Sequence, residues 1–317
     1  MASVTGLRIA FFGTPAFAVP TLAALLASAH TIAGVVTQPD KPRGRGQKVS
    51  EGPVKALAQS HDVRVLQPSR LSRELFEADF AALDAELGVV AAYGKLLPDW
   101  LLEAPRLGMV NVHASLLPKY RGAAPIHRAV MNGDPETGVT IMRVVKALDA
   151  GPMLAAATRP IGPEESADNV ERDLAVMGAA LLVTTIDALA AGAAVEVPQD
   201  DAQATYAPRL TKEEGLLDFT RPAIEVHNRI RGLRRWPGAY TFLDGQRLGV
   251  VRARLTDRSI GATQPGMCID GTSGGITIAC GDGRAIEVLD LQPEGRRVMT
   301  AREYVSGHGG LAGRRLG

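Results

Sequence analysis

The sequence contains few of the residues that cross-link a chain or bind metals. Only two of its 317 residues are cysteines, Cys268 and Cys280, and their spacing matches neither a redox pair nor a zinc site. The six histidines show no ligand spacing with one another or with the cysteines. Such a composition is typical of a reducing compartment, so we predict a cytoplasmic protein with no disulfide framework and no metal.

Two sequence signatures of common enzyme classes are also missing. The first strand-like run leads into Gly13-Thr14-Pro15 and not into G-x-G-x-x-G, so the dinucleotide fingerprint is absent where it belongs. No serine or cysteine stands in the strand–turn–helix context of a nucleophile elbow. The chain therefore lacks the marks of a nicotinamide-dependent dehydrogenase and of an enzyme with its own activated nucleophile.

Charge is missing from the N-terminal stretch between Ile9 and Ala29, which is the pattern of a signal peptide or a membrane span. Gly13, Pro15 and Pro20 interrupt this stretch and argue against both. We predict instead a buried strand that ends at Gly13, followed by a helix with Thr14 at its N-cap and Pro15 at its first position. No association with a membrane is expected.

The first half of the chain alternates short apolar runs with helical patterns. This alternation predicts an α/β fold with a mostly parallel sheet covered by helices. An Ala/Leu-rich helix is expected over 167–191, and the stretch that follows it reads as a linker. The predicted organisation is a catalytic domain over 1–191, a linker over 192–208 and a second domain over 209–317.

The last third of the chain has a β pattern. Asp-Gly pairs stand between apolar runs at 244–245, 270–271 and 282–283, and such pairs are a strong hairpin signal. We therefore predict a small antiparallel barrel or sandwich. A capping box, Thr300-x-x-Glu303, predicts a short final helix.

Charge is distributed unevenly between the predicted domains. Residues 209–317 hold 17 Lys and Arg against 12 Asp and Glu, a net charge of +5, whereas the chain as a whole carries +1. A basic domain favours an anionic partner such as a nucleic acid. Chance composition is the alternative, and charge by itself does not separate the two.

Polar side chains interrupt the apolar run that begins at Leu107. Asn111 and His113 are two residues apart on an expected strand, so they share one face at its carboxyl end. That end is where open α/β sheets bind their ligands. The amide can donate to a developing oxyanion and the imidazole can carry a proton, which suits a transfer whose substrate brings the nucleophile.

Asp149 ends the next strand-like run, within "KALDAGP". If the two strands are neighbours, its carboxylate reaches His113 and fixes the tautomer or favours the charged ring. The alternative is that Asn111 and His113 only satisfy hydrogen bonds in a turn and that Asp149 belongs to an ordinary turn.

Several of these motifs resemble those of a known family. "NVHASLLPKYRGAAPI" and "GVTIMRVVKALDAGPML" resemble the formyltransferases that use 10-formyltetrahydrofolate, whose signature is Asn-x-His-x-Ser-Leu-Leu-Pro with a downstream Leu-Asp-x-Gly. Four further stretches resemble those family members whose acceptor is methionyl-tRNA: "FFGTPAFAVPTL", "VVTQPDKPRGRGQK", "VVAAYGKLLP" and "TYAPRLTKEEGLLDF". The similarity covers nearly the whole chain.

The resemblance implies both a fold and a reaction. The fold is a Rossmann-like formyltransferase domain followed by an oligonucleotide-binding-like β-barrel that binds tRNA. The reaction is transfer of the formyl group of 10-formyltetrahydrofolate to the α-amino group of methionine on initiator methionyl-tRNA, for translation initiation. The implied partners are that tRNA and the folate cosubstrate, with no membrane and no obligate protein partner.

The resemblance also implies roles for individual residues. The catalytic positions fall on Asn111, His113 and Asp149. The folate-binding positions fall on Tyr93, Gly94, Ser115, Leu116, Leu117 and Pro118. The tRNA-contacting loop supplies Lys41, Arg43, Arg45 and Lys48, for which a solvated surface loop is the alternative. Arg121 is not assigned to catalysis, because it reads equally well as a structural residue at a helix start.

Three other functions compete with this one. A formyltransferase with a small-molecule acceptor shares Asn111, His113 and Asp149 but is not expected to carry the basic loop and the basic β-rich domain. A non-catalytic RNA-binding protein of the same fold has no need of the three residues. A dehydrogenase lacks its glycine fingerprint. Formyl transfer to methionyl-tRNA, tested against a small amine, separates these possibilities.

Overall fold

The computed structural model describes residues 6–43, 48–257, 260–261, 263–270 and 275–317. The chain forms two compact units. The N-terminal unit comprises the described residues of Met1–Pro125, Thr137–Arg159 and Glu171–Ala207, and the C-terminal unit those of Ile126–Glu136, Pro160–Val170 and Pro208–Gly317. The domain boundaries expected from the sequence remain a prediction.

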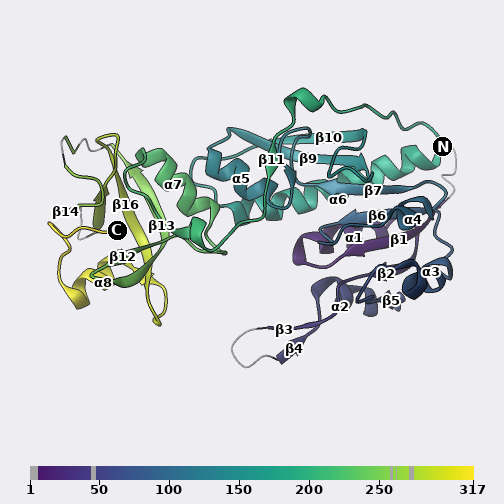
Figure 1. Ribbon diagram of the computed structural model, residues 1–317, viewed down its shortest axis with the longest axis horizontal. Helices are drawn as coiled ribbons and strands as arrows, with labels where there is room; N and C mark the ends of the chain where they lie inside the picture. Colours follow the sequence, from purple (N-terminus) through teal and green to yellow (C-terminus); the bar gives the residue numbers. More distant parts are fainter. Residues whose placement is uncertain (1–5, 44–47, 258–259, 262, 271–274) are drawn as a thin grey trace. The chain divides into compact units, whose positions relative to one another are not determined.

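A seven-stranded sheet forms the centre of the N-terminal unit (Figure 1). The strand order is β10-β9-β7-β6-β1-β2-β5. All neighbours from β5 to β7 are parallel, and β9 runs antiparallel to β7. The predicted mostly parallel sheet is confirmed. The strands are β1 (Arg8–Gly13), β2 (Thr31–Val36), β5 (Val65–Leu66), β6 (Leu87–Ala91), β7 (Met109–His113), β9 (Glu136–Arg143) and β10 (Met153–Pro160).

Helices cover both faces of this sheet. On one face, Phe76 and Phe80 of α3 form a buried cluster that includes Met109 of β7. On the other face, a Cβ atom at Gly178 of α6 would lie 2.7 Å from Val112, so only glycine allows this close contact. The helices of this unit are α1 (Val19–Leu26), α2 (Pro53–Gln59), α3 (Arg73–Ala81), α4 (Asp99–Glu103) and α6 (Ala167–Ala190, of which the part from Glu171 belongs here).

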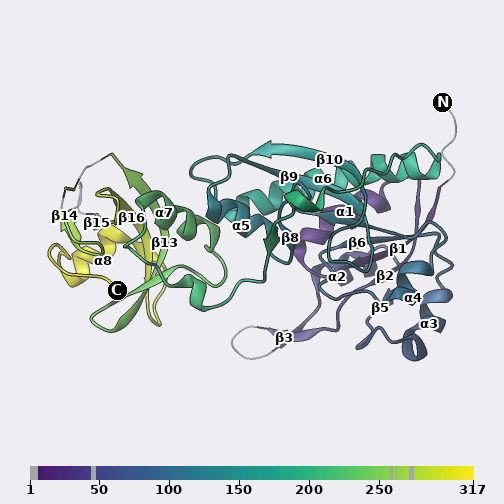
Figure 2. The same cartoon turned by 45° about the horizontal axis from the view of Figure 1, so that its top comes forward.

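Because successive side chains of a strand point to opposite faces, Asn111 and His113 share the face of Met109. Val110 and Val112 point the other way, toward the α6 face. Figure 2 shows α6 running beside β9 and β10.

α6 is long and apolar enough to cross a membrane by length and composition alone. Its buried residues include Leu174, Leu182 and Ile186, and Gly178 packs closely on the sheet. These contacts are those of a core helix of the N-terminal unit.

The expected helix cap at Thr14 is wrong. A 3₁₀ turn, η1 (Ala16–Ala18), follows β1, and α1 begins only at Val19, with Pro20 in its first turn. A helix that started at Pro15 would place Pro20 in its second turn, where the missing N–H leaves a carbonyl without its bond. The Thr14 hydroxyl instead accepts a hydrogen bond from the backbone N–H of Gln38 at 3.2 Å.

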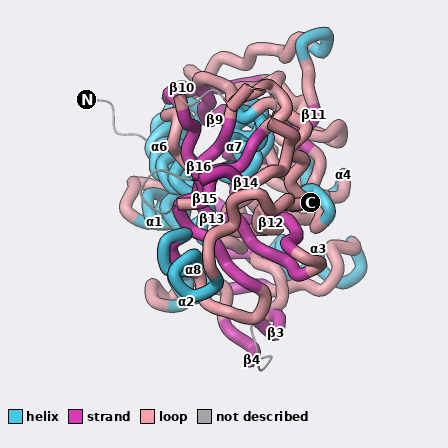
Figure 3. The backbone as a smooth tube through the Cα atoms, turned by 90° about the vertical axis from the view of Figure 1, so that its left-hand side faces the viewer, coloured by secondary structure: helices cyan, strands magenta, loops and turns pink. Residues whose placement is uncertain are grey.

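The C-terminal unit contains the predicted antiparallel sheet, in the order β12-β13-β16-β15-β14 with β17 beside β16. Figure 3 draws the strands in magenta. Asp244 and Gly245, both with positive φ, join β12 to β13 as a hairpin, and Asp282-Gly283 joins β15 to β16. The third expected hairpin turn includes Gly271, which lies outside the described residues. The strands are β12 (Tyr240–Leu243), β13 (Gln246–Thr256), β14 (Cys268–Asp270), β15 (Ile276–Ala279), β16 (Ala285–Pro293) and β17 (Met299–Thr300).

Three helices complete this unit: α5 (Pro125–Asn132, of which all but Pro125 belongs here), α7 (Ala223–Gly232) and α8 (Ala301–His308). Thr300 and Glu303 form the expected capping box at the start of α8. Hydrogen bonds from the Thr300 backbone and hydroxyl and from Arg297 lower the pKa of the Glu303 carboxyl to about 2. The prediction of this helix start is confirmed.

The stretch after α6 pairs with two strands of the N-terminal unit. Met153 and Val197 form an isolated antiparallel bridge, and β11 (Tyr206–Ala207) pairs in parallel with β8 (Arg121–Gly122). Between them lies a 3₁₀ turn, η2 (Asp201–Gln203). Residues of the predicted linker 192–208 thus pair with β10 and with β8, the strand that follows β7 in the chain.

Candidate active site

Asn111 and His113 lie where the sequence places them, on β7 at the centre of the sheet. Asn111 stands opposite Val90 of β6 on one side and Met142 of β9 on the other. Its side chain is half-buried, and it makes no hydrogen bond to any residue that the structure describes. A carboxamide held on a rigid strand without a protein partner is suited to donate to a bound substrate.

The imidazole of His113 is 5% exposed and faces an oxygen on each side. Its Nε2 lies 2.9 Å from the backbone carbonyl oxygen of Tyr120, and its Nδ1 lies 3.7 Å from Oδ2 of Asp149. Because a carbonyl oxygen only accepts, Nε2 carries a hydrogen and donates it. Nδ1 is therefore the ring nitrogen that gains or loses a proton, and it does so beside a carboxylate.

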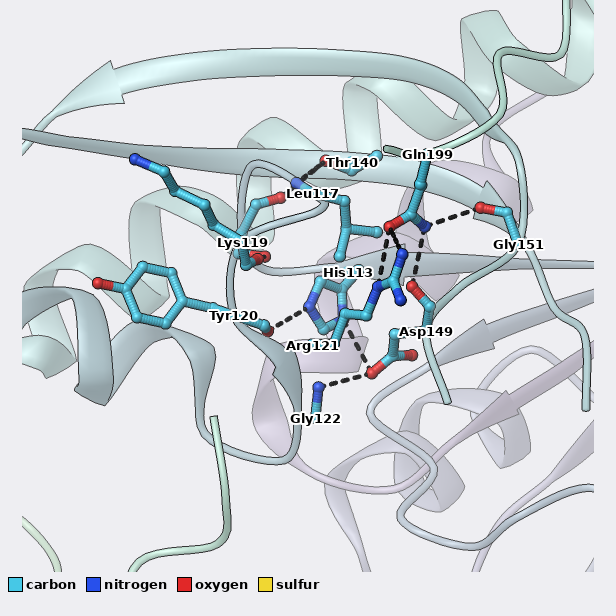
Figure 4. A network of polar contacts seen from close by, with 11 residues as sticks. His113, Leu117, Lys119, Tyr120, Arg121, Gly122, Thr140, Asp149, Gly151 and Gln199 are labelled. Atoms are coloured by element: carbon cyan, nitrogen blue, oxygen red, sulfur yellow. Dashed lines mark hydrogen bonds and ion pairs between the residues drawn. The ribbon is translucent and has the colours of Figure 1, made fainter. Parts of the chain in front are cut away.

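Asp149 reaches His113 by a longer route than the sequence suggested. β7 and β9 are neighbours, but they are antiparallel, so β9 ends beside Val110 and not beside His113. The loop between β9 and β10 then carries Asp149 to the ring. Its Oδ2 accepts a hydrogen bond from the backbone N–H of Gly122 at 2.8 Å, so one carboxylate oxygen faces both Gly122 and His113 (Figure 4).

Arg121 lies on β8 and not at a helix start, since α5 begins only at Pro125; that alternative is wrong. Its buried guanidinium donates to Oε1 of Gln199 from Nε at 3.0 Å and from Nη2 at 2.8 Å. Gln199 in turn donates to the backbone carbonyl oxygens of Asp149 and Gly151 (Figure 4). The sequence did not predict a role for Gln199, because no motif includes this residue.

The segment that follows β7 is a tight, internally bonded turn. The Ser115 hydroxyl donates to the carbonyl oxygen of Lys119 at 2.6 Å, and the Leu117 N–H donates to the Thr140 hydroxyl at 3.1 Å. Ser115 and Leu117 are buried, whereas Leu116 and Pro118 are half-buried. Of these four predicted folate-binding residues, only Leu116 and Pro118 thus keep substantial side-chain surface for a ligand.

The two other predicted folate residues, Tyr93 and Gly94, follow β6, the parallel neighbour of β7. The Tyr93 side chain is 1% exposed, and burial raises the pKa of its hydroxyl to about 12. Its ring packs edge-on against Phe12 with the centroids 5.5 Å apart. Gly94 has φ +81°, in the left-handed region that favours glycine. A ligand at this point would meet backbone and not the phenol.

The basic loop begins and ends in a small hairpin of β3 (Lys41–Arg43) and β4 (Lys48–Ser50). Arg45 lies outside the described residues, so its predicted role stays a prediction. The same holds for the side chains of Lys41, Arg43 and Lys48.

The cysteines do not contribute a nucleophile. Cys268 and Cys280 are buried, and burial raises the pKa of their thiols to about 11 and about 12. A thiol with so high a pKa carries almost no thiolate near neutral pH. Among the described residues, no three His, Cys, Asp or Glu side chains form a group that could hold a metal ion. The absence of a metal remains a prediction.

These groups together offer a defined chemistry. The groups lie together near the carboxyl end of β7. They are the Asn111 amide, which no described residue hydrogen-bonds, the His113 ring with Nε2 fixed and Nδ1 next to a carboxylate, and the rigid turn after the strand. They can stabilise negative charge on an oxygen and move a proton, without forming a covalent bond to substrate.

The chain is similar to known proteins over nearly all of its length. The family model described as "Formyl transferase" matches residues 7–186, and that of "Formyl transferase, C-terminal domain" matches residues 209–309. A methionyl-tRNA formyltransferase of Moorella thermoacetica is 47% identical, with 98% of this chain and 99% of the relative covered. One of Geobacter sulfurreducens is 45% identical, with 99% and 98% covered.

Among solved structures, an N-formyltransferase of Helicobacter canadensis, in complex with folinic acid and dTDP-3-aminofucose, has a TM-score of 0.66. The match covers 90% of this chain and 99% of that one, at 17% identity, and so supports the fold alone. The two family matches together span both units and include Asn111, His113 and Asp149. The chain therefore belongs to the formyl transferase family.

Proposed function

We propose that the protein transfers the formyl group of 10-formyltetrahydrofolate to the α-amino group of methionine on initiator methionyl-tRNA. The observation that carries the proposal is the amide of Asn111, which no described residue hydrogen-bonds, beside a histidine whose Nδ1 faces Asp149. The acceptor is inferred from relatives that carry the name methionyl-tRNA formyltransferase and are covered at 98–99% of their length. The protein is accordingly a cytoplasmic transferase of translation initiation.

The proposed mechanism uses the side chains as follows. The neutral amine of the methionyl ester attacks the formyl carbon, and a C–N bond forms while negative charge grows on the formyl oxygen. The Asn111 amide donates a hydrogen bond to that oxygen, and His113 in its charged form stabilises it further. The bond to the folate nitrogen then breaks, and that nitrogen takes up a proton equivalent to the one that the amine gives up.

Asp149 and Tyr120 set the direction of proton movement in this scheme. The Tyr120 carbonyl keeps the Nε2 hydrogen in place, so protons pass through Nδ1. The Asp149 carboxylate, 3.7 Å from Nδ1, can exchange a proton with the ring through a water molecule. No protein nucleophile and no metal take part in the proposed steps.

The folate cosubstrate is proposed to lie along the ends of β6 and β7. The exposed Gly94 offers backbone groups, next to a Tyr93 carbonyl that accepts from the Gln38 amide at 2.7 Å, and Leu116 and Pro118 offer half-buried apolar surface. Both suit a flat heterocycle that needs hydrogen bonds along its edge and apolar contact on its faces.

One assay tests the proposal. Purified protein is incubated with 10-formyltetrahydrofolate and either methionyl-tRNA or a nucleotide-linked amino sugar, and formylated product is measured. We expect transfer to methionyl-tRNA only. Transfer to the amino sugar alone would identify a small-molecule formyltransferase, and binding of tRNA without transfer would identify a non-catalytic RNA-binding protein.

The basic loop gives a separate prediction. Arg45→Ala is expected to lower kcat/KM for methionyl-tRNA by about tenfold, because the loss of one cation–phosphate or base-edge contact costs roughly that much. The affinity for folate should not change, since the loop is not among the predicted folate segments. The control is Arg73→Ala on α3, which removes an exposed arginine with the same charge. Equal loss of folate and tRNA affinity in Arg45→Ala would show that the loop is structural.

A further inference from the structure

Asp149 has a left-handed backbone conformation. Its φ is +47°, in a region that few residues other than glycine enter, although aspartate and asparagine enter it more often than most. Its carboxylate is bonded to the Gly122 N–H at 2.8 Å and lies 3.7 Å from His113. The distance between carboxylate and ring therefore depends on what holds the backbone of this loop.

Gln199 holds that backbone from the side opposite the carboxylate. Its Nε2 donates to the carbonyl oxygens of Asp149 and Gly151, at 2.8 Å each. Both hydrogens of one amide group are thus used on two carbonyls of the same loop. The amide holds the Asp149–Ala150 and Gly151–Pro152 peptide units and fixes the turn in which Asp149 lies (Figure 4).

Arg121 determines which way the Gln199 amide points. The guanidinium only donates, so the atom that it contacts at 2.8 and 3.0 Å is the amide oxygen, and the nitrogen must face the loop. Arg121 is 4% exposed, and its remaining ion pair is with Asp201 at 2.7 Å. If the Gln199 amide were turned round, its nitrogen would face the buried Arg121 guanidinium and both groups would lack an acceptor. The observed orientation is therefore the only one that leaves no polar group unpaired.

The same short segment holds the ring of His113. Tyr120 accepts the Nε2 hydrogen, Arg121 orients Gln199, and the Gly122 N–H bonds Asp149. The segment is itself tied to the stretch after α6, since the Tyr120 N–H donates to the Thr205 hydroxyl at 2.9 Å and β8 pairs with β11. Three consecutive residues therefore set the positions of the histidine and the aspartate together.

We propose that Gln199 and Arg121 are positioning residues of the active site, which hold Asp149 in register with His113. The proposal rests on the proposed formyl transfer. It assigns a positioning role to one residue of the predicted linker 192–208: Gln199 acts through Asp149, and neither Gln199 nor Arg121 contacts substrate. Loss of Gln199 frees the loop, and a displacement of the carboxylate by about 1 Å is enough to slow a reaction strongly.

The test uses full-length protein with Gln199→Ala and Gln199→Glu. The carboxylate introduced by Gln199→Glu keeps an acceptor for Arg121 but cannot donate to the two carbonyls, so both variants break the clamp by different means. We expect kcat for formyl transfer to fall about tenfold in each, with KM for folate and for methionyl-tRNA within about twofold of the wild type. The matched control is Asp201→Asn, which weakens the other, solvent-exposed contact of Arg121 and should leave kcat within about twofold.

A double-mutant cycle separates positioning from a general structural role. In an Asp149→Asn background, Gln199→Ala should lower kcat by less than about twofold, because the carboxylate that it positions is gone. If the two effects multiply, or if Gln199→Ala raises KM and leaves kcat unchanged, the proposal is overturned. Thermal unfolding of each variant confirms that the proteins compared are folded.

A measurement independent of activity keeps this test separate from the proposed function. The ¹⁵N resonances of the His113 ring, identified by their loss in His113→Ala, should shift in Gln199→Ala and stay in place in Asp201→Asn. Wild-type protein that shows no formyl transfer would refute the proposed function, and the ring resonances would then still decide the positioning role. Unmoved ring resonances, or a wild-type kcat in a folded Gln199→Ala protein, would refute the positioning role alone.

Discussion

Replacing Asn111 or His113 with alanine is expected to slow formyl transfer to methionyl-tRNA by about a hundredfold or more, the usual scale for losing an oxyanion donor or an acid–base group. Asn111 offers the unpartnered amide on β7, and His113 offers the nitrogen beside Asp149. The measurement is kcat/KM for each substrate, with circular dichroism to establish folding.

A matched control comes from a histidine outside the site. His61→Ala removes an exposed imidazole bonded only near the end of α2, and it should leave the rate unchanged. The two site variants should lose kcat and keep the affinity for folate within a few-fold, since their contacts strengthen as charge develops. Near-normal turnover by a folded His113→Ala protein would remove the histidine from the mechanism.

The sequence allowed the elements with strong local signals to be predicted. Apolar runs indicated the parallel strands, and alternation along β7 placed Asn111 and His113 on one face. The Asp-Gly pair at 244–245 and the Thr300–Glu303 capping box are confirmed. Each of these depends on residues within a few positions of one another, so the pattern itself contains the structural cause.

Features that depend on distant contacts could not be predicted. The Thr14 hydroxyl bonds Gln38, 24 residues away, and not the start of a helix. The Arg121 side chain bonds Gln199, 78 residues away, so a residue that resembled a helix start belongs to a network around Asp149. No periodicity encodes such a pair. The antiparallel orientation of β9 also had no local signal, although the proximity of Asp149 to His113 was anticipated.

The active site includes residues on both sides of residue 191, where the sequence predicts that the catalytic domain ends. β7 carries two of the polar groups, the β9–β10 loop carries the third, and the stretch after α6 bonds that loop through Gln199. A truncation after α6 would therefore remove β11 and Gln199 together with the C-terminal unit. Tests of tRNA binding by the C-terminal unit need point substitutions for this reason.

The arginines of residues 209–317, the stretch with a net charge of +5, differ in whether an acidic side chain pairs with them. Arg252 and Arg254 pair with Asp290 and Glu287 on the neighbouring strand, so their charges are largely neutralised. Arg234, in contrast, is exposed and forms no ion pair with any residue that the structure describes. It stands two residues before Trp236, which is 49% exposed. An exposed cation next to an exposed indole is suited to a nucleic-acid backbone and a base.

Substituting Arg234 and Trp236 together with alanine is therefore expected to weaken the affinity for methionyl-tRNA by about a hundredfold at about 0.1 M salt. One lost phosphate contact should flatten the plot of log affinity against log salt by about one unit of slope, and the lost stacking should add a salt-independent decrease. Trp236→Ala alone should lower affinity with an unchanged slope. The control is Arg252→Ala, which removes the same charge from a position paired with Asp290 and should leave the slope within about half a unit. If the control flattens the slope as much as the test variant does, overall charge governs binding and the Arg234–Trp236 surface is not a tRNA site.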